Sequence, residues 1–71
     1  MAKVTKIEKV DFKKLQKMAE DWMESMGEGV REDLRKNGLS YDSVLLKFPA
    51  LPQSQREYIR GYIDGSLGYN P

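Results

Sequence analysis

The sequence predicts an all-α protein, a single domain of residues 1–71 built as a small bundle of three to four short helices. Apolar residues recur at helical spacing in two segments, 12–26 and 53–66. Capping residues and stop signals delimit two shorter helical segments between them, 30–36 and 41–47. Because no cysteine is present, the packing of these helices has to hold the fold together without disulfide bonds.

An extended basic arm or a short edge strand is predicted for residues 1–10. Val4, Ile7 and Val10 recur at every third position, without the strict alternation of a half-buried strand. Charge is unevenly distributed along the first half of the chain. Residues 1–17 hold six lysines and two acids, whereas residues 18–33 hold six acids and one arginine. Mutual pairing and solvation of the surface account for such runs, and docking of one pole on a charged partner is the alternative.

The first helix, 12–26, starts at Asp11, whose carboxylate can accept hydrogen bonds from the free amides of the first turn. Its lysines occupy the N-terminal turns and its acids the C-terminal turns, which opposes the helix macrodipole. Contacts elsewhere in the fold or a partner surface could explain this order of charges. The predicted apolar side comprises Phe12, Leu15, Met18, Ala19, Trp22, Met23 and Met26.

Two short helices follow. Gly27 and Gly29 interrupt the pattern, and the helix 30–36 is predicted to end at the stop signal Asn37-Gly38. Ser40 caps the helix 41–47, which ends ahead of Pro49 because a residue before proline favours extended conformations. We expect Val44, Leu45 and Phe48 to point inward, and a strand over residues 43–48 is the competing prediction.

The last helix, 53–66, starts at Pro52 or Ser54. Gly61 and Gly65 lie one turn apart on its flank, and each costs about 1 kcal/mol relative to alanine. Such a flank suits the close approach of another backbone, in this chain or in a partner. The predicted apolar side comprises Tyr58, Ile59, Tyr62, Ile63 and Leu67.

The run LPQSQREYIRGYIDGSLGY, residues 51–69, resembles the helix of LAGLIDADG homing endonucleases. In that family a proline-led segment precedes a helix whose glycines pack against its two-fold mate, and Gly61, Asp64 and Gly65 match the pattern. The acid that binds the catalytic metal in the family falls at Ser66 here, and no sheet-forming sequence follows. The resemblance therefore implies a glycine-faced helix at a subunit interface, and no nuclease activity.

The composition also argues against an enzyme. Histidine and cysteine are both absent, which removes the usual general base and the commonest zinc ligands. The serines lack a base, the acids lack calcium-loop spacing, and GEG at 27–29 lacks the lysine and the strand of a phosphate-binding loop. We therefore expect no catalysis, no cofactor and no metal. No apolar run approaches the roughly 20 residues that span a bilayer, so we expect a cytoplasmic protein without membrane contact.

These observations favour a small protein-binding module. We expect a regulator or inhibitor of the compact kind common in phages and mobile elements, which masks a partner surface or forms a homodimer. Tyrosine, tryptophan and arginine dominate interface hot spots. The predicted partner-binding residues are Trp22, Tyr58, Arg60, Gly61, Tyr62, Gly65 and Tyr69.

The alternative is a nucleic-acid-binding module that uses the basic arm and the first helix, with Arg56 and Arg60 of the last helix. Nucleic-acid-binding domains typically have a pI above about 9, whereas the pI of this chain is 7.9. The acidic middle of the chain would also repel phosphate. We therefore prefer a protein partner. The predicted nucleic-acid contacts are Lys6, Lys9, Lys13, Lys14 and Lys17.

Overall fold

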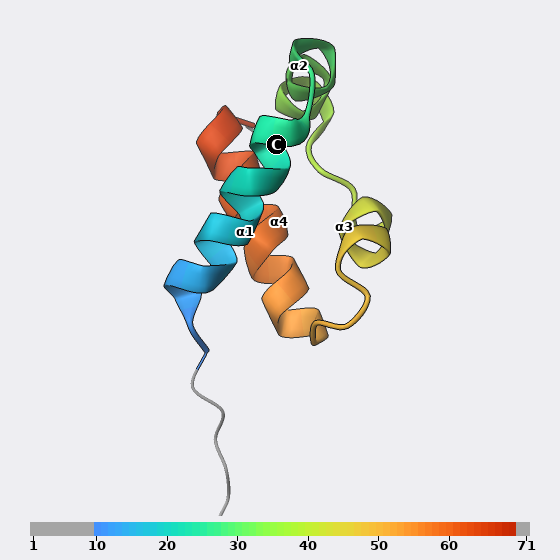
Figure 1. Cartoon of the computed structure of the whole chain (residues 1–71). Helices are drawn as coiled ribbons and strands as arrows, with labels where there is room; N and C mark the ends of the chain where they lie inside the picture. The colour runs from blue at the N-terminus through green and yellow to red at the C-terminus, as the bar shows by residue number, and fades with distance from the viewer. Residues whose placement is uncertain (1–9, 70–71) are drawn as a thin grey trace, which may run out of the picture.

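A computed structural model describes residues 10–69 of the chain. These residues form four helices and, within the described range, no strand, so the predicted all-α bundle is confirmed (Figure 1). The predicted arm lies outside the described residues, apart from Val10. The helices are α1 (Phe12–Ser25), α2 (Glu28–Asn37), α3 (Tyr41–Lys47) and α4 (Gln53–Leu67).

Helix α1 begins where the sequence predicts, because Asp11 caps it. The Asp11 carboxylate accepts a hydrogen bond from the backbone N–H of Lys14 at 3.2 Å. The helix ends at Ser25, one residue before the predicted boundary, since Met26 has an extended backbone with φ −86° and ψ 148°. Both ends are therefore set by local backbone conformation.

Helix α2 begins at Glu28, two residues earlier than predicted. Gly29 lies inside the helix, and Gly27 is its N-cap. The end of the helix is close to the prediction: Asn37 is the last helical residue, and Gly38 follows with φ 82°. Such a positive φ favours glycine, so the Asn37-Gly38 stop signal ends the helix as predicted.

The bounds predicted for α3 are confirmed. The Ser40 hydroxyl accepts a hydrogen bond from the backbone N–H of Ser43 at 3.2 Å, which caps the first turn. The N–H of Phe48 bonds to the carbonyl oxygen of Val44 at 2.8 Å, and the chain then leaves the helix before Pro49. The competing strand over residues 43–48 is wrong, because these hydrogen bonds make the segment helical.

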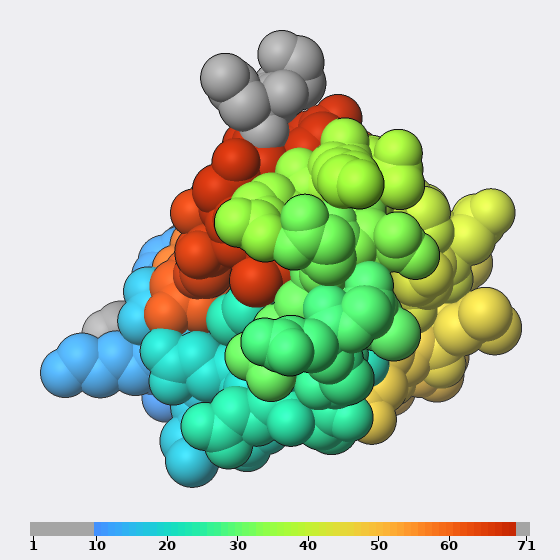
Figure 2. Space-filling view, turned by 90° about the horizontal axis from the view of Figure 1, so that it is seen from above, coloured from blue at the N-terminus to red at the C-terminus, as the bar shows by residue number. Residues whose placement is uncertain are grey.

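Helix α4 runs one residue beyond its predicted end and is the helix that the other three share. Pro52 is its N-cap, and Gly68 closes its C-terminus in a left-handed conformation with φ 84°. It packs against α1, α3 and α2. Helices α1 and α4 lie side by side with their N-terminal ends at the same end of the bundle (Figure 1), and α2 lies across the other end, beside the last turn of α4 (Figure 2).

The core is small and combines all but one of the helices with one linker residue. Helix α2 contributes no fully buried residue. Leu39, in the linker between α2 and α3, is only 3% exposed, although no periodic pattern includes it. The buried residues are Leu15, Ala19, Leu39, Val44, Ile59 and Ile63.

Two apolar residues are more exposed than predicted: Phe12 of the predicted apolar side of the first helix, and Leu45, which was predicted to point inward. Phe12 is 51% exposed, because it is the first residue of α1 and lies at an end of the bundle. Leu45 is 39% exposed, whereas its neighbour Val44 is fully buried. A helix of seven residues packs on α4 with one narrow face, and Val44 occupies that face. The predicted apolar side of α4 is confirmed by Ile59 and Ile63, both 0% exposed.

We predict that Ile59→Ala lowers the free energy of unfolding by about 2–5 kcal/mol, because it leaves a cavity in the centre of the core. A domain of this size has only a few kcal/mol of stability, so the variant should lose its cooperative transition. Urea unfolding followed by circular dichroism measures the change. Leu46→Ala is the control, since Leu46 is 83% exposed and its truncation should change stability by less than about 0.5 kcal/mol. Equal stability of the two variants would contradict this core.

Candidate functional site

The outward face of α4 is the first candidate surface. Gly61 and Gly65 are both exposed, and a Cβ atom added at either position would meet no other atom within 4 Å. Among the described residues, nothing approaches the glycine flank of α4. The close contact that these glycines would permit is therefore not made inside residues 10–69 of this chain. We call the surface of Ser54, Glu57, Gly61 and Gly65 the glycine face.

Tyr58 and Tyr62 border the glycine face and connect α4 to α1. The Gln16 amide donates a hydrogen bond to the Tyr58 hydroxyl at 2.8 Å, and the Tyr62 hydroxyl donates one to the Glu20 carboxylate at 2.7 Å. The two tyrosine rings stack with centroids 6.4 Å apart, and the Phe12 ring lies 4.9 Å from the Tyr58 ring. Both tyrosines are thereby held in one orientation while part of each ring stays accessible.

The hydrogen bond between Tyr62 and Glu20 also changes the acidity of the phenol. Accepting this bond, the Glu20 carboxylate raises the pKa of Tyr62 above its ordinary value of 10.0, and partial desolvation and the negative charge of Glu20 act in the same direction. The bond therefore stabilises the protonated phenol, which is the form that donates the hydrogen.

Arg60 and Asp64 have an internal role that the sequence did not reveal. They lie one turn apart and do not pair with each other. Arg60 Nε donates to the carbonyl oxygen of Leu39 at 2.8 Å, and the Asp64 carboxylate accepts from the N–H of the same residue at 2.8 Å. Arg60 also pairs with Glu57 at 3.0 Å on the surface. Arg60, which was predicted to bind a partner, thus holds the linker between α2 and α3 on α4.

The remaining two predicted partner-binding residues, Trp22 and Tyr69, also pack against other residues of this chain. Trp22 is half-buried against the core, and its ring meets the Phe48 ring edge-on at 5.4 Å. Tyr69 packs on Gly38: a Cβ atom added at Gly38 would lie 2.9 Å from the Tyr69 ring. Tyr69 therefore provides a second reason for glycine at position 38, beside the positive φ.

Arg56, one of the two arginines considered for nucleic-acid contact, is engaged with the end of α3. Its guanidinium donates to the carbonyl oxygens of Phe48 at 3.3 Å, Pro49 at 3.4 Å, and Leu51. It also donates to the Tyr41 hydroxyl at 3.2 Å. A cation at a helix C-terminus satisfies free carbonyl groups and complements the macrodipole. Arg56 and Arg60 are thus both used inside the fold.

The predicted lysine contacts divide into two sets. Lys13, Lys14 and Lys17 are exposed on α1, whereas Lys6 and Lys9 lie outside the described residues. Lys17 pairs with Asp21 at 3.8 Å, and with both side chains mostly exposed this pair contributes little. The basic surface that the structure describes is therefore a small one at the start of α1.

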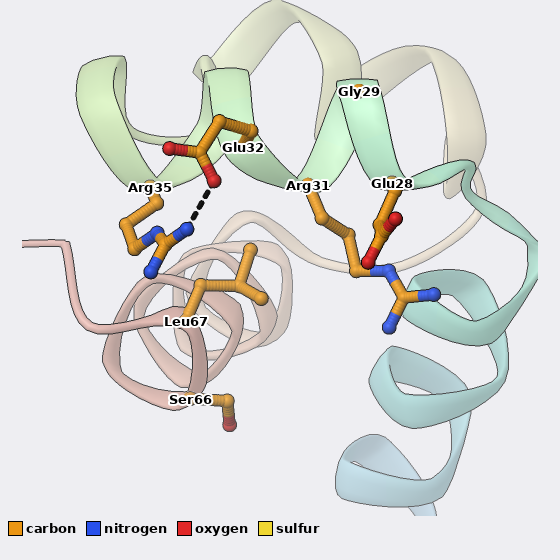
Figure 3. A pocket seen from close by; sticks show the side chains of 7 residues that line it. All are labelled: Glu28, Gly29, Arg31, Glu32, Arg35, Ser66 and Leu67. Carbon is orange, nitrogen blue, oxygen red and sulfur yellow. Dashed lines mark hydrogen bonds and ion pairs between the residues drawn. The ribbon is translucent and has the colours of Figure 1, made fainter.

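A hollow of about 540 Å³ lies between α2 and the last turn of α4 (Figure 3). Arg35 forms an ion pair with Glu32 at its edge, and Arg31 lies beside Glu28. The lining thus carries two charges of each sign and no net charge. The lining residues are Glu28, Gly29, Arg31, Glu32, Arg35, Ser66 and Leu67.

In the part of the chain that the structure describes, no group of three or more acidic side chains is placed to hold a metal ion. No helix among the same residues is long and apolar enough to cross a bilayer.

Comparisons with family models, curated proteins and solved structures found no match to this chain. The resemblance of residues 51–69 to the LAGLIDADG helix accordingly stays a prediction about packing.

We predict that Asp64→Ala lowers the free energy of unfolding by about 1–3 kcal/mol, because the buried N–H of Leu39 loses its acceptor. Urea unfolding gives the stability, and hydrogen exchange of the Leu39 amide should accelerate. Asp64→Asn keeps an acceptor oxygen and should lose less. Glu57→Ala is the control, since it removes only a surface ion pair worth less than about 1 kcal/mol. A loss no greater than in Glu57→Ala, with unchanged exchange at Leu39, would refute this role.

We predict that Glu20→Gln lowers the pKa of Tyr62 toward its ordinary value, because a neutral amide accepts the phenol hydrogen bond more weakly than the carboxylate and carries no negative charge. Because the folded pKa is raised, the stabilisation is present below about pH 10 and disappears as the pH rises through the folded pKa. Alkaline titration of ¹³C-labelled tyrosine by NMR measures the pKa. Glu24→Gln, one turn further along α1, is the control and should leave the Tyr62 titration unchanged. Identical titrations in both variants would count against the bond.

Proposed function

We propose that this chain is a protein-binding module that masks a surface of its partner with the glycine face of α4. The observation that carries the proposal is the open environment of Gly61 and Gly65, where an added Cβ atom would meet nothing within 4 Å. The function follows from the energetic cost of these residues and from the groups that border them.

The two glycines are costly for a domain of this size. Each destabilises a helix interior by about 1 kcal/mol relative to alanine, so the pair costs about 2 kcal/mol. A small single-core domain has only about 3–5 kcal/mol of stability. No contact among the described residues offsets this cost, because both positions face open space. Close approach of a partner backbone would offset it, since only glycine leaves room for such an approach.

The border of the glycine face suits recognition of a protein. Tyr58 and Tyr62 are held by hydrogen bonds to Gln16 and Glu20 before any partner arrives. Side chains that are already ordered lose less conformational entropy on binding, and tyrosine is a frequent interface anchor. Arg60 and Trp22 are less suited, because each is engaged inside the fold.

A second copy of this chain and a different protein both fit the glycine face. Self-association is supported by the resemblance of residues 51–69 to a helix that pairs with its own copy, and a regulator or inhibitor would use the same face on another protein. The nucleic-acid alternative has less support, because Arg56 and Arg60 are engaged internally.

We predict that Gly61→Leu abolishes partner binding and leaves the fold intact. Leucine favours helices, and nothing in the described chain lies near the new side chain. Light scattering measures self-association, and pull-down with the tagged chain from its native cell measures capture of another protein. The wild type should form a dimer or retain one stoichiometric protein, and Gly61→Leu should lose that species.

Gly29→Leu is the matched control. Gly29 is also an exposed helical glycine with nothing within 4 Å of an added Cβ atom, but it lies on α2. This variant should bind as the wild type does, and circular dichroism should show both variants folded. Retention of the partner by Gly61→Leu, or no association by the wild type, would remove the proposal. Binding of duplex DNA that weakens steeply with salt would support the nucleic-acid alternative instead.

A further inference from the structure

The exposed surface of α1 next to the tyrosines of α4 carries charges of both signs. Gln16 and Glu20 of this surface bond to the tyrosines. Lys13 and Lys17 lie one turn before these two residues, and Glu24 lies one turn after them, so all share one side of α1. We call this surface the charged flank, and its charged side chains are all exposed: Lys13, Lys17, Glu20, Asp21 and Glu24.

The order of these charges is unfavourable within a single molecule. Lys13 and Lys17 are one turn apart, and like charges at this spacing destabilise a helix. The same holds for Glu20 and Glu24 in the next two turns. Among the described residues, the one ion pair on the charged flank joins Lys17 to Asp21 at 3.8 Å, and its exposure makes it weak. Most of this charge therefore lacks a counter-charge within residues 10–69.

Helices α1 and α4 run side by side in the same direction (Figure 1). Tyr58 bonds to Gln16 and Tyr62 bonds to Glu20, and both pairs are separated by 42 positions. The same offset sets Gly61 of α4 level with position 19 of α1. The lysines of the charged flank precede this level and its acids follow it. The basic and acidic halves thus lie on either side of Gly61 along the bundle.

We propose that the partner at the glycine face is a second copy of this chain, with the α4 helices of the two copies antiparallel. This inference rests on the proposed function, because it uses the same face and adds the identity and orientation of the partner. A two-fold axis at Gly61, perpendicular to α4, would bring Gly61 against its own copy and Gly65 against the second copy's Glu57. Each close approach would then have glycine on at least one side.

The same axis would pair the charged flanks of the two copies. The charged flank and the glycine face both adjoin the tyrosines between α1 and α4, so a second copy on one would also reach the other. Reversal about the level of position 19 sets Lys17 opposite the second copy's Asp21, and Lys13 opposite position 25, beside the second copy's Glu24. Each pair occurs twice by symmetry.

This complementarity selects a second copy in the antiparallel orientation as the occupant. The basic half of each charged flank would meet the acidic half of the other, which relieves the repulsion within each molecule. A parallel pair of copies would instead set lysine against lysine and glutamate against glutamate, and like charges across an interface disfavour association.

Charge reversal tests this orientation. The acidic variant carries Lys13→Glu with Lys17→Glu, and the basic variant carries Asp21→Lys with Glu24→Lys, while Glu20 keeps its bond to Tyr62. Light scattering and analytical ultracentrifugation should show a wild-type dimer. Each variant alone should dimerise at least about tenfold more weakly, because like charges meet in both pairs. An equimolar mixture of the two variants should regain an affinity within about threefold of the wild type, because opposite charges meet again.

Lys47→Glu is the matched control for the acidic variant. Lys47 is an exposed lysine on α3, away from the charged flank, so its reversal should change the dimer affinity less than about twofold. Circular dichroism establishes that each variant is folded. Restoration by mixing also requires that both variants are folded, so it separates the effect of charge from a loss of structure.

Three results would overturn the inference. They are a monomeric wild type, variants that dimerise alone as strongly as the wild type, and a mixture that stays as weak as its components. The proposed function can survive each of them. It stands if a dimer is insensitive to charge reversal but lost in Gly61→Leu, and it stands if a monomeric wild type retains a different protein that Gly61→Leu loses.

Discussion

The peptide of Leu39 is held on both sides by α4, through Arg60 on its carbonyl oxygen and Asp64 on its N–H, each at 2.8 Å. Helix α2 has no fully buried residue, and the linker that follows it adds to its contact with α4. With its backbone fixed, Leu39 becomes a core residue at 3% exposure, and Gly38 receives the ring of Tyr69. Two polar side chains one turn apart thus connect α2 and α3 to the helix that carries the rest of the core.

Because α4 packs against three other helices, its sides make different contacts. One side meets α1 through Tyr58 and Tyr62, the centre carries Ile59 and Ile63, and the third side holds the Leu39 linker. Only the glycine face is left without a neighbour in the described chain. A helix that is constrained on three sides presents its fourth side rigidly. This rigidity favours binding with little loss of conformational entropy.

The structure explains part of the unusual charge order of α1. The acids of its C-terminal half are partly explained by a tertiary contact, because Glu20 accepts the hydrogen bond of Tyr62. The lysines of its N-terminal half have no such contact among the described residues, except the weak surface pair of Lys17 with Asp21. The hydrogen bond of Glu20 therefore accounts for one of the charges that oppose the macrodipole of α1.

The sequence alone determined the four helices to within two residues, because capping and termination depend on groups within a few positions of each other. Local chemistry explains why Asp11 and Ser40 cap their helices and why α2 ends at Gly38. Apolar periodicity identified Ile59 and Ile63 for the same reason, since it defines the face of a helix.

Only the tertiary structure decided which faces are covered and which polar groups meet. Phe12 is exposed and Leu39 is buried because the ends of neighbouring elements determine burial there, and periodicity does not describe them. The bonds from Tyr62 to Glu20 and from Leu39 to Asp64 join residues 42 and 25 positions apart. Such pairs form only when the helices pack. The same packing left the glycine face without a neighbour among the described residues, and no local pattern specifies what remains uncovered.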